Sequence, residues 1–159
     1  MKPYPYCICA TVGEKSLQAL LEASGKGSYK DDHPWLVARE FFAQAGEASA
    51  RLPILFATGQ PSEFSHWGFI EAIDVFELHR GQWETRCGFS PLKPINPIWT
   101  AIDSVFLKPS AEQERREVLE NIHQHRYALN EGELHPYAIC ETPPFIIAEA
   151  AEAELSGES

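Results

Sequence analysis

Short apolar segments separated by turn residues occupy the middle of the chain. Four of them follow one another, at residues 53–57, 65–75, 83–89 and 99–107. Consecutive segments of this length, with Gly59 and Gly81 in the turns between them, are typical of strands in a small antiparallel sheet. Along residues 67–78 the character of alternating positions changes partway, which predicts a bulge or bend. We therefore expect a small, mostly antiparallel β-barrel.

Helical periodicity is found in the segments that flank these strands. Three helices are expected, at residues 14–24, 33–46 and 110–123. The third begins with Ser110 and Gln113, which form a capping-box pattern. Residues 4–11 and 135–146 read as additional strands. The predicted fold class is thus α/β (α+β), with the barrel and its flanking helices in one domain over residues 1–147. Residues 148–159 are expected to form an acidic, flexible tail, either a frayed helix or disordered.

Bulk composition is that of an ordinary globular chain. Of its 159 residues, 44% are hydrophobic and 23% charged, and no run approaches the roughly 20 apolar residues that span a bilayer. The first residues lack the charged and apolar regions of a secretory signal, so we expect a cytoplasmic location and no membrane partner. In that compartment the four cysteines are expected to be free thiols packed as small hydrophobic side chains.

The net charge of −10 bears directly on the choice of partner. Nonspecific binding to nucleic acid requires clustered basic residues, and this chain is acidic throughout. A role with nucleic acid would therefore need a focused basic patch or a pocket for a single nucleotide. The candidate contacts for such a patch are Arg80, Arg86, Lys93 and Lys108.

A cluster of polar and aromatic residues at one strand entrance is the first candidate site. Ser65, His66 and Trp67 are expected to form one wall of an open hollow at the barrel mouth, because small polar residues there are not needed for packing. An indole supplies a flat face for a planar ligand, and Ser, His or Asp can hydrogen-bond to its edge. Trp83, Trp99 and Asp103 are further candidates for this pocket.

Two other kinds of site, a metal site and a hydrolytic pair, have less support in the sequence. His123, His125 and His135, with Cys140 or Glu141, could share a metal, but the first two straddle a predicted helix end where their side chains diverge. A hydrolytic pair of Lys93 or Lys108 with Asp103 or Glu71 is not selected by any spacing. We therefore predict no metal and no cofactor.

The order of elements resembles the PUA-like superfamily, in particular its EVE and ASCH branches. The resemblance is carried by residues 55–57, followed by the glycine-bearing strand at residues 68–72, and by the late segment at 99–106 with the helix after it. It implies a pocket for a nucleobase, often a modified one, within RNA or DNA. Some members of the ASCH kind hydrolyse modified nucleosides, but their Lys-Thr-Glu set is not found here.

The function predicted from these observations is recognition of a modified nucleobase or nucleotide in an aromatic pocket, and binding is expected rather than catalysis. Two alternatives remain open at this point. One is a small interaction or accessory protein with a protein partner, and the other is a hydrolase acting on a modified nucleoside.

Overall fold

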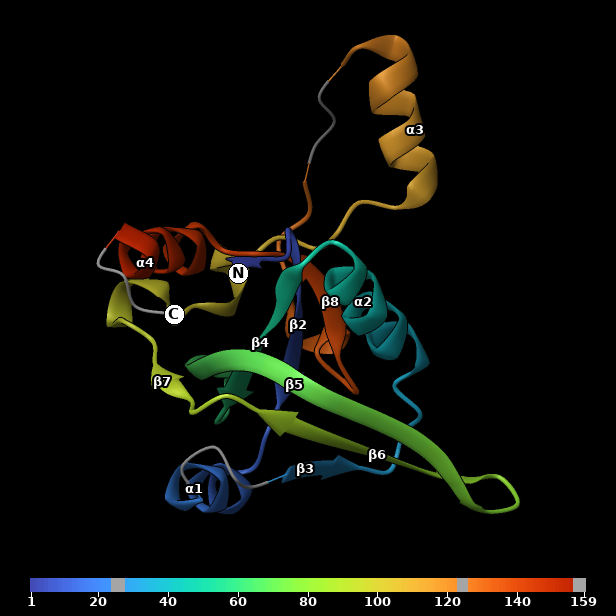
Figure 1. The fold of residues 1–159 in the computed structure, drawn as a ribbon, viewed down its shortest axis with the longest axis vertical. Helices are drawn as coiled ribbons and strands as arrows, with labels where there is room; N and C mark the ends of the chain where they lie inside the picture. Colours follow the sequence, from blue (N-terminus) through green and yellow to red (C-terminus); the bar gives the residue numbers. More distant parts are fainter. Residues whose placement is uncertain (24–27, 123–125, 156–159) are drawn as a thin grey trace.

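A mostly antiparallel sheet forms the centre of the computed structural model, which describes residues 1–23, 28–122 and 126–155 (Figure 1). Its eight strands are β1 (Lys2–Pro3), β2 (Tyr6–Thr11), β3 (Ser28–Asp31), β4 (Ala50–Thr58), β5 (Glu63–His79), β6 (Gln82–Phe89), β7 (Lys93–Pro94) and β8 (Ala138–Glu141). Among the described residues, the α-helices are α1 (Glu14–Glu22), α2 (Leu36–Glu47), α3 (Ala111–Glu120) and α4 (Pro144–Leu155). The predicted mixture of helices and strands is therefore confirmed.

The sheet is open. Its strand order is β3-β6-β5-β4-β2-β8, with β1 paired to β4 and β7 paired to β5 off this path. β1 and β2 run parallel to β4, and the remaining pairs are antiparallel. β3 and β8 stand at the two ends of the order, so the closure expected of a barrel is not confirmed.

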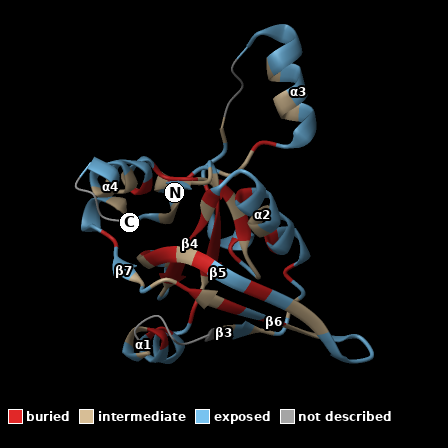
Figure 2. Ribbon diagram, in the orientation of Figure 1, coloured by how far each residue is buried: buried red, intermediate tan, exposed pale blue. Residues whose placement is uncertain are grey.

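Strand β4 is buried on both faces and separates two hydrophobic cores (Figure 2). Ile54 and Phe56 point into a first core that also contains side chains from α1 and α2. Leu55 and Ala57 point into a second core with Trp67 and with Ile146 of α4. This division follows from strand geometry, because successive side chains point to opposite faces.

Strand β5 also contributes to both cores, and its pairing is irregular. Its register with β4 shifts between Phe56 and Ala57, and its register with β6 shifts between Ile70 and Ala72. Each extra residue bends the strand and raises its local twist. The bulge predicted in this segment is confirmed.

The segment at 99–107 is not the strand that was predicted. Two short 3-10 helices lie at its start and within it, η1 (Pro97–Trp99) and η2 (Ile102–Ser104). Its strand pairing is limited to isolated bridges, from Ala101 to Glu63, from Phe106 to Ala128 and from Leu107 to Cys140. Proline supplies no backbone N–H for a ladder, and the Asn96 side chain accepts a hydrogen bond from Ile98 N at 3.1 Å, which favours a helical turn. The segment instead crosses the second core as irregular structure.

The four cysteines are free and buried, as predicted. Cys7 and Cys140 lie opposite each other on β2 and β8. Burial raises the pKa of Cys87 to about 12 and raises that of Cys7. The thiols of Cys7 and Cys87 therefore stay protonated and act as packing groups.

Helix α3 stands away from the body of the molecule (Figure 1). The Ser110 hydroxyl accepts a hydrogen bond from Gln113 N at 3.1 Å, as the capping pattern predicts, and Asn121 ends the helix with a φ of 53°. Lys108 Nζ donates to Glu114 at 3.1 Å and so holds the base of the helix. Val118 and Leu119 are 80% and 77% exposed, so this helix adds nothing to either core.

Helix α4 crosses the predicted boundary between domain and tail, since it continues from Pro144 to Leu155. Its first turn inserts Phe145 and Ile146 against the second core. None of the described helices combines the length and the apolar character that crossing a bilayer requires.

Gly68→Ala tests how closely the chain crosses β5. A Cβ at residue 68 would lie 2.9 Å from Leu92 Cδ2 and 3.2 Å from Ser90 Oγ, and that hydroxyl accepts a hydrogen bond from Phe69 N. We expect the substitution to lower the free energy of unfolding by about 1–3 kcal/mol, measured by urea denaturation. Gly88→Ala is the matched control, because its Cβ would meet only Ala72 at 3.9 Å. Equal effects of the two substitutions would contradict this account of the crossing.

Candidate functional site

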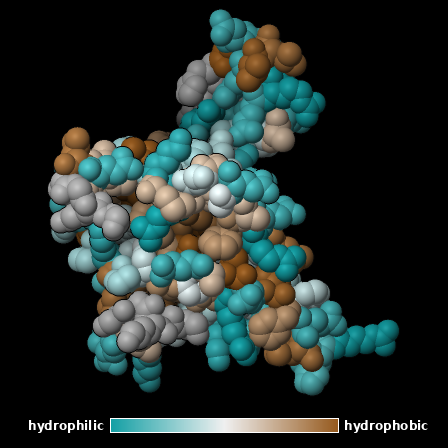
Figure 3. Space-filling model, viewed as in Figure 1, coloured by the Kyte–Doolittle hydropathy of each residue, from teal (hydrophilic) through white to brown (hydrophobic). Residues whose placement is uncertain are grey.

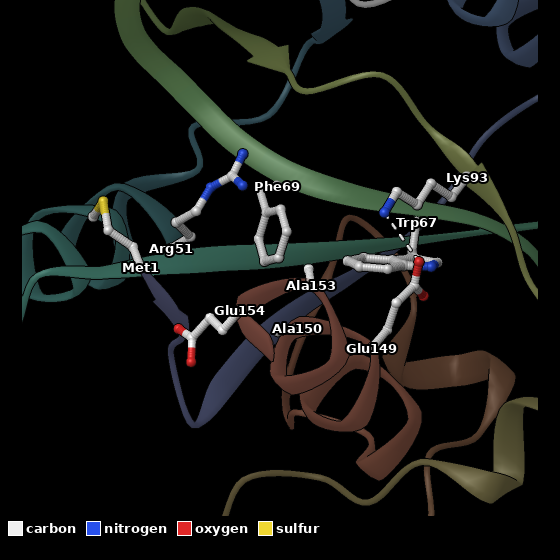
Figure 4. Close-up of a pocket in the computed structure, with 9 residues that line it drawn as sticks. All are labelled: Met1, Arg51, Trp67, Phe69, Lys93, Glu149, Ala150, Ala153 and Glu154. Carbon is white, nitrogen blue, oxygen red and sulfur yellow. Dashed lines mark hydrogen bonds and ion pairs between the residues drawn. The ribbon is translucent and has the colours of Figure 1, made fainter. Parts of the chain in front are cut away.

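A cavity of about 160 Å³ lies between α4 and the neighbouring parts of β4, β5 and β7 (Figure 4). Its chemically important lining residues are Arg51, Trp67, Phe69, Lys93, Glu149 and Glu154. The cavity therefore combines two aromatic rings with two cations and two carboxylates. A planar ligand that carries negative charge fits this combination.

Strand register brings these side chains together. Trp67 lies opposite Leu55 on β4 and opposite Lys93 on β7, and Phe69 lies opposite Pro53. Because alternate strand positions share a face, Arg51 lies on the same side of β4 as Pro53 and Leu55. Helix α4 then faces this surface with Glu149.

Each ring of the cavity has a cation over it. The guanidinium carbon of Arg51 lies 4.0 Å from the centre of the Phe69 ring, and Lys93 Nζ lies 5.5 Å from the centre of the Trp67 ring. Lys93 Nζ also donates to Glu149 Oε1 at 3.0 Å. These side chains are 57% and 43% exposed, so water screens the pair and its contribution to stability is small.

Trp67 does not form the open wall that was predicted, and this expectation is corrected. The residue is only 2% exposed and belongs to the second core, where its ring packs edge-on against Phe69 and Phe145. The physical reason is the cover that α4 provides over this face of the sheet. Only the part of the indole that lines the cavity is available to a ligand.

Neither Ser65 nor His66 lines the cavity with Trp67. His66 follows the register shift, opposite Phe56 on β4 and Pro94 on β7, so its side chain and that of Trp67 point to opposite faces. Ser65 Oγ and His66 Nδ1 are covered from solvent and have no hydrogen-bond partner among the described residues. Burial lowers the pKa of His66 below its usual 6.5.

The other predicted pocket residues are dispersed. Trp83 lies opposite Glu77, near the turn between β5 and β6, and Asp103 is exposed on η2. Trp99 does not contact Trp67 directly, because the ring of Phe145 lies between them. Its ring centre lies 5.7 Å from that of Phe145, which also contacts Trp67. A side chain of α4 thus occupies the space between the two indoles where the sequence predicted a ligand.

The predicted basic patch does not form. Arg80 is exposed at the hairpin turn, Arg86 pairs with Glu84 and Lys108 pairs with Glu114. Of the four predicted cations, Lys93 alone lines the cavity. The hydrolytic pairing of Lys93 or Lys108 with Asp103 or Glu71 gains no support either, since both lysines are paired with glutamates of the helices.

Sequence reasoning missed Arg51, Phe69 and Glu149. The alternation along β5 contained a signal for Phe69, because it has the same parity as Trp67. Arg51 likewise has the parity of Leu55, which pairs with Trp67. No such signal existed for Glu149, because its place depends on how α4 folds back over the sheet.

The histidine hypothesis is tested only in part. His123 and His125 lie outside the described residues. His135 lies beside His33, with the two ring centres 4.9 Å apart. Neither Cys140, which is buried, nor Glu141, which binds Arg126 at 2.9 Å, lies in a metal-binding group among the residues that the structure describes.

His66→Gln is expected to change the dependence of stability on pH. Because the pKa of His66 is lower in the folded than in the unfolded chain, unfolding takes up a proton between these two values. The wild-type free energy of unfolding should therefore fall as the pH drops from about 6.5 through the folded pKa, beyond the fall seen in the variant. Urea denaturation at pH 5 to 8 measures this difference. His79→Gln, at the exposed end of β5, is the control, and a wild-type pH profile in His66→Gln would contradict the assignment.

Comparisons with models of protein families, with curated proteins and with solved structures find no match for this chain. The resemblance to PUA-like domains therefore stays a prediction from the sequence. The case for a function depends on the geometry of the cavity beside α4.

Proposed function

We propose that this chain binds a nucleobase or nucleotide, modified bases included, in the cavity between α4 and β5. The observation that supports this most directly is the pairing of each aromatic ring in the cavity with a cation, Arg51 over Phe69 and Lys93 over Trp67. Rings bind a planar base through stacking and edge contacts, and guanidinium and ammonium groups bind phosphate.

The size of the cavity favours a single ring. An apolar cavity of about 150 Å³ in another protein accommodates benzene, and the volume here is about 160 Å³. A pyrimidine base is of that size, with its sugar and phosphate outside, toward the exposed side chains of Lys93 and Arg51. Because the chain carries a net charge of −10, a free nucleotide or one extruded base is favoured over an extended strand.

Opening of the cavity depends on the pair of Lys93 and Glu149. The Glu149 carboxylate already pairs with the Lys93 ammonium group, to which a phosphate would otherwise bind. The pair is exposed, so its separation costs little, about 0.2–1 kcal/mol. A bound phosphate would replace Glu149 on Lys93 and give the base more of the Trp67 surface.

The alternative of an interaction protein is favoured by a different observation. Val118, Leu119 and Ile122 expose apolar side chains at the end of α3 that points away from the body (Figure 3). If this is the main function, a partner protein would co-purify with the chain, Leu119→Ser would release it, and nucleotides would leave the tryptophan fluorescence unchanged. The third possibility, a nucleoside hydrolase, has no observation in its favour.

Tryptophan fluorescence tests the proposed site directly. We expect cytidine 5′-monophosphate or its 5-methyl derivative to quench part of the emission of the four tryptophans at low salt. Trp67→Phe keeps an aromatic ring in the core and should remove this change. Trp83→Phe, near the β5–β6 turn, is the matched control and should retain it. Saturable quenching that persists in Trp67→Phe would contradict the location, and no quenching by either nucleotide would contradict the function.

The two cations should contribute separately to affinity. In Lys93→Met and Arg51→Met the aliphatic stems remain, but the hydrogen bonds to phosphate are lost. We expect each variant to bind cytidine monophosphate at least about tenfold more weakly, because a hydrogen bond to a charged group contributes about 1.5–3 kcal/mol. Calorimetric titration measures the change, and Arg80→Met at the exposed turn is the control. Affinities equal to that of the control would exclude the two cations from the site.

Removal of the competing carboxylate should have the opposite effect. Glu149→Gln frees Lys93, so the affinity for the nucleotide should rise by a factor of up to about five. Glu152→Gln removes the same charge from an exposed position of α4 that does not line the cavity. An equal rise in both variants would mean that only the net charge of the helix matters, and not the pair with Lys93.

A further inference from the structure

A second cluster of chemically active side chains lies between β3 and α2, apart from the cavity beside α4. Asp31, Asp32 and His33 are consecutive, and each offers a ligand atom within 4.8 Å of the others. His33 Nδ1 lies 3.2 Å from Asp31 Oδ2 and 2.9 Å from Asp32 Oδ1. The ring of His135, more than a hundred residues further along, packs against His33 with the centres 4.9 Å apart. Two carboxylates and one imidazole therefore converge, with a second imidazole packed beside them.

The hydrogen on His33 Nδ1 cannot form hydrogen bonds with both carboxylates at once. A single hydrogen on His33 Nδ1 can point at only one of the two carboxylate oxygens, so a neutral histidine leaves two negative charges beside it. A divalent cation placed among the same atoms would contact both carboxylates and the ring nitrogen and would balance both charges. Metal–ligand distances of about 2.0–2.2 Å place neighbouring ligand atoms about 3.0–3.5 Å apart, close to the separations found here.

Hydrogen bonds to buried side chains hold residues 31–33 in place. Trp35, which is fully buried, donates its indole N–H to Asp31 Oδ2 at 2.6 Å. Thr85 is also fully buried, and its hydroxyl accepts from Trp35 N at 3.0 Å and donates to the His33 carbonyl at 2.6 Å. Donors of this kind orient a ligating carboxylate and raise the affinity of a metal site. Asp31 and His33 are thus positioned before any ion arrives.

We propose that Asp31, Asp32 and His33 bind one divalent transition-metal ion such as Zn²⁺, with water in the remaining coordination position. Two carboxylates with an imidazole suit zinc and its neighbours in the first transition row, whereas Mg²⁺ and Ca²⁺ prefer sites made of oxygen atoms alone. Asp32 is 88% exposed, so the ion can enter from solvent. This site is separate from the nucleotide cavity, and either can exist without the other.

Titration of the full, tag-free chain with ZnCl₂ after treatment with a chelator tests the site. We expect one ion per chain in calorimetry, and binding of Co²⁺ with visible absorption bands but no thiolate band in the near ultraviolet. Asp31→Asn and His33→Gln should each weaken Zn²⁺ binding by at least tenfold. CaCl₂ should not compete at equal concentration.

Two further variants separate loss of the site from loss of the fold. Asp32→Asn changes an exposed side chain that belongs to neither core, so loss of binding in this variant cannot result from unfolding. His79→Gln, an exposed histidine at the end of β5, is the control and should bind as the wild type does. The absence of saturable binding, a thiolate band that reveals cysteine ligands, or wild-type affinity in Asp32→Asn and His33→Gln would overturn the proposal.

Discussion

The burial of β4 on both of its faces is the constraint on which the rest of the structure depends. Residues 52–57 are all buried, and their side chains alternate between two cores. Each face therefore needs its own cover. Helices α1 and α2 supply part of it on one side, and α4 with the irregular segments around Val105 and Leu129 supplies it on the other. The cavity lies on this second side, at the margin between α4 and the sheet.

This arrangement places side chains of α4 where the sequence predicted a ligand. Helix α4 brings Phe145 between two indoles and Glu149 onto Lys93, so the protein's own side chains satisfy both the aromatic and the cationic groups. The two contacts differ in their energetic character. Phe145 is part of a packed core, whose disruption costs several kcal/mol, whereas the exposed pair of Lys93 and Glu149 contributes less than about 1 kcal/mol. A ligand of the proposed type would therefore displace Glu149 and leave the core intact.

Local signals in the sequence predicted local structure well. Ser110 and Gln113 cap α3 as their spacing implies, β6 begins where the hairpin turn predicts, and the irregular alternation along β5 corresponds to its register shifts. The errors concern long-range packing. Trp67, Trp83 and Trp99 look equivalent in sequence, yet only the fold decides that one is buried, one lies by a turn and one packs on Phe145. Residues 99–107 also show apolar spacing typical of a strand, but in the fold they contain a 3-10 helix and pair only through isolated bridges.

The most direct measurement of the central claim is the indole N–H signal of each tryptophan in ¹⁵N-labelled protein during addition of cytidine monophosphate. The account predicts that the Trp67 signal shifts progressively to saturation, while the Trp83 signal stays in place. If Trp67 does not respond, or if all four indoles shift together, then the cavity beside α4 is not a ligand site.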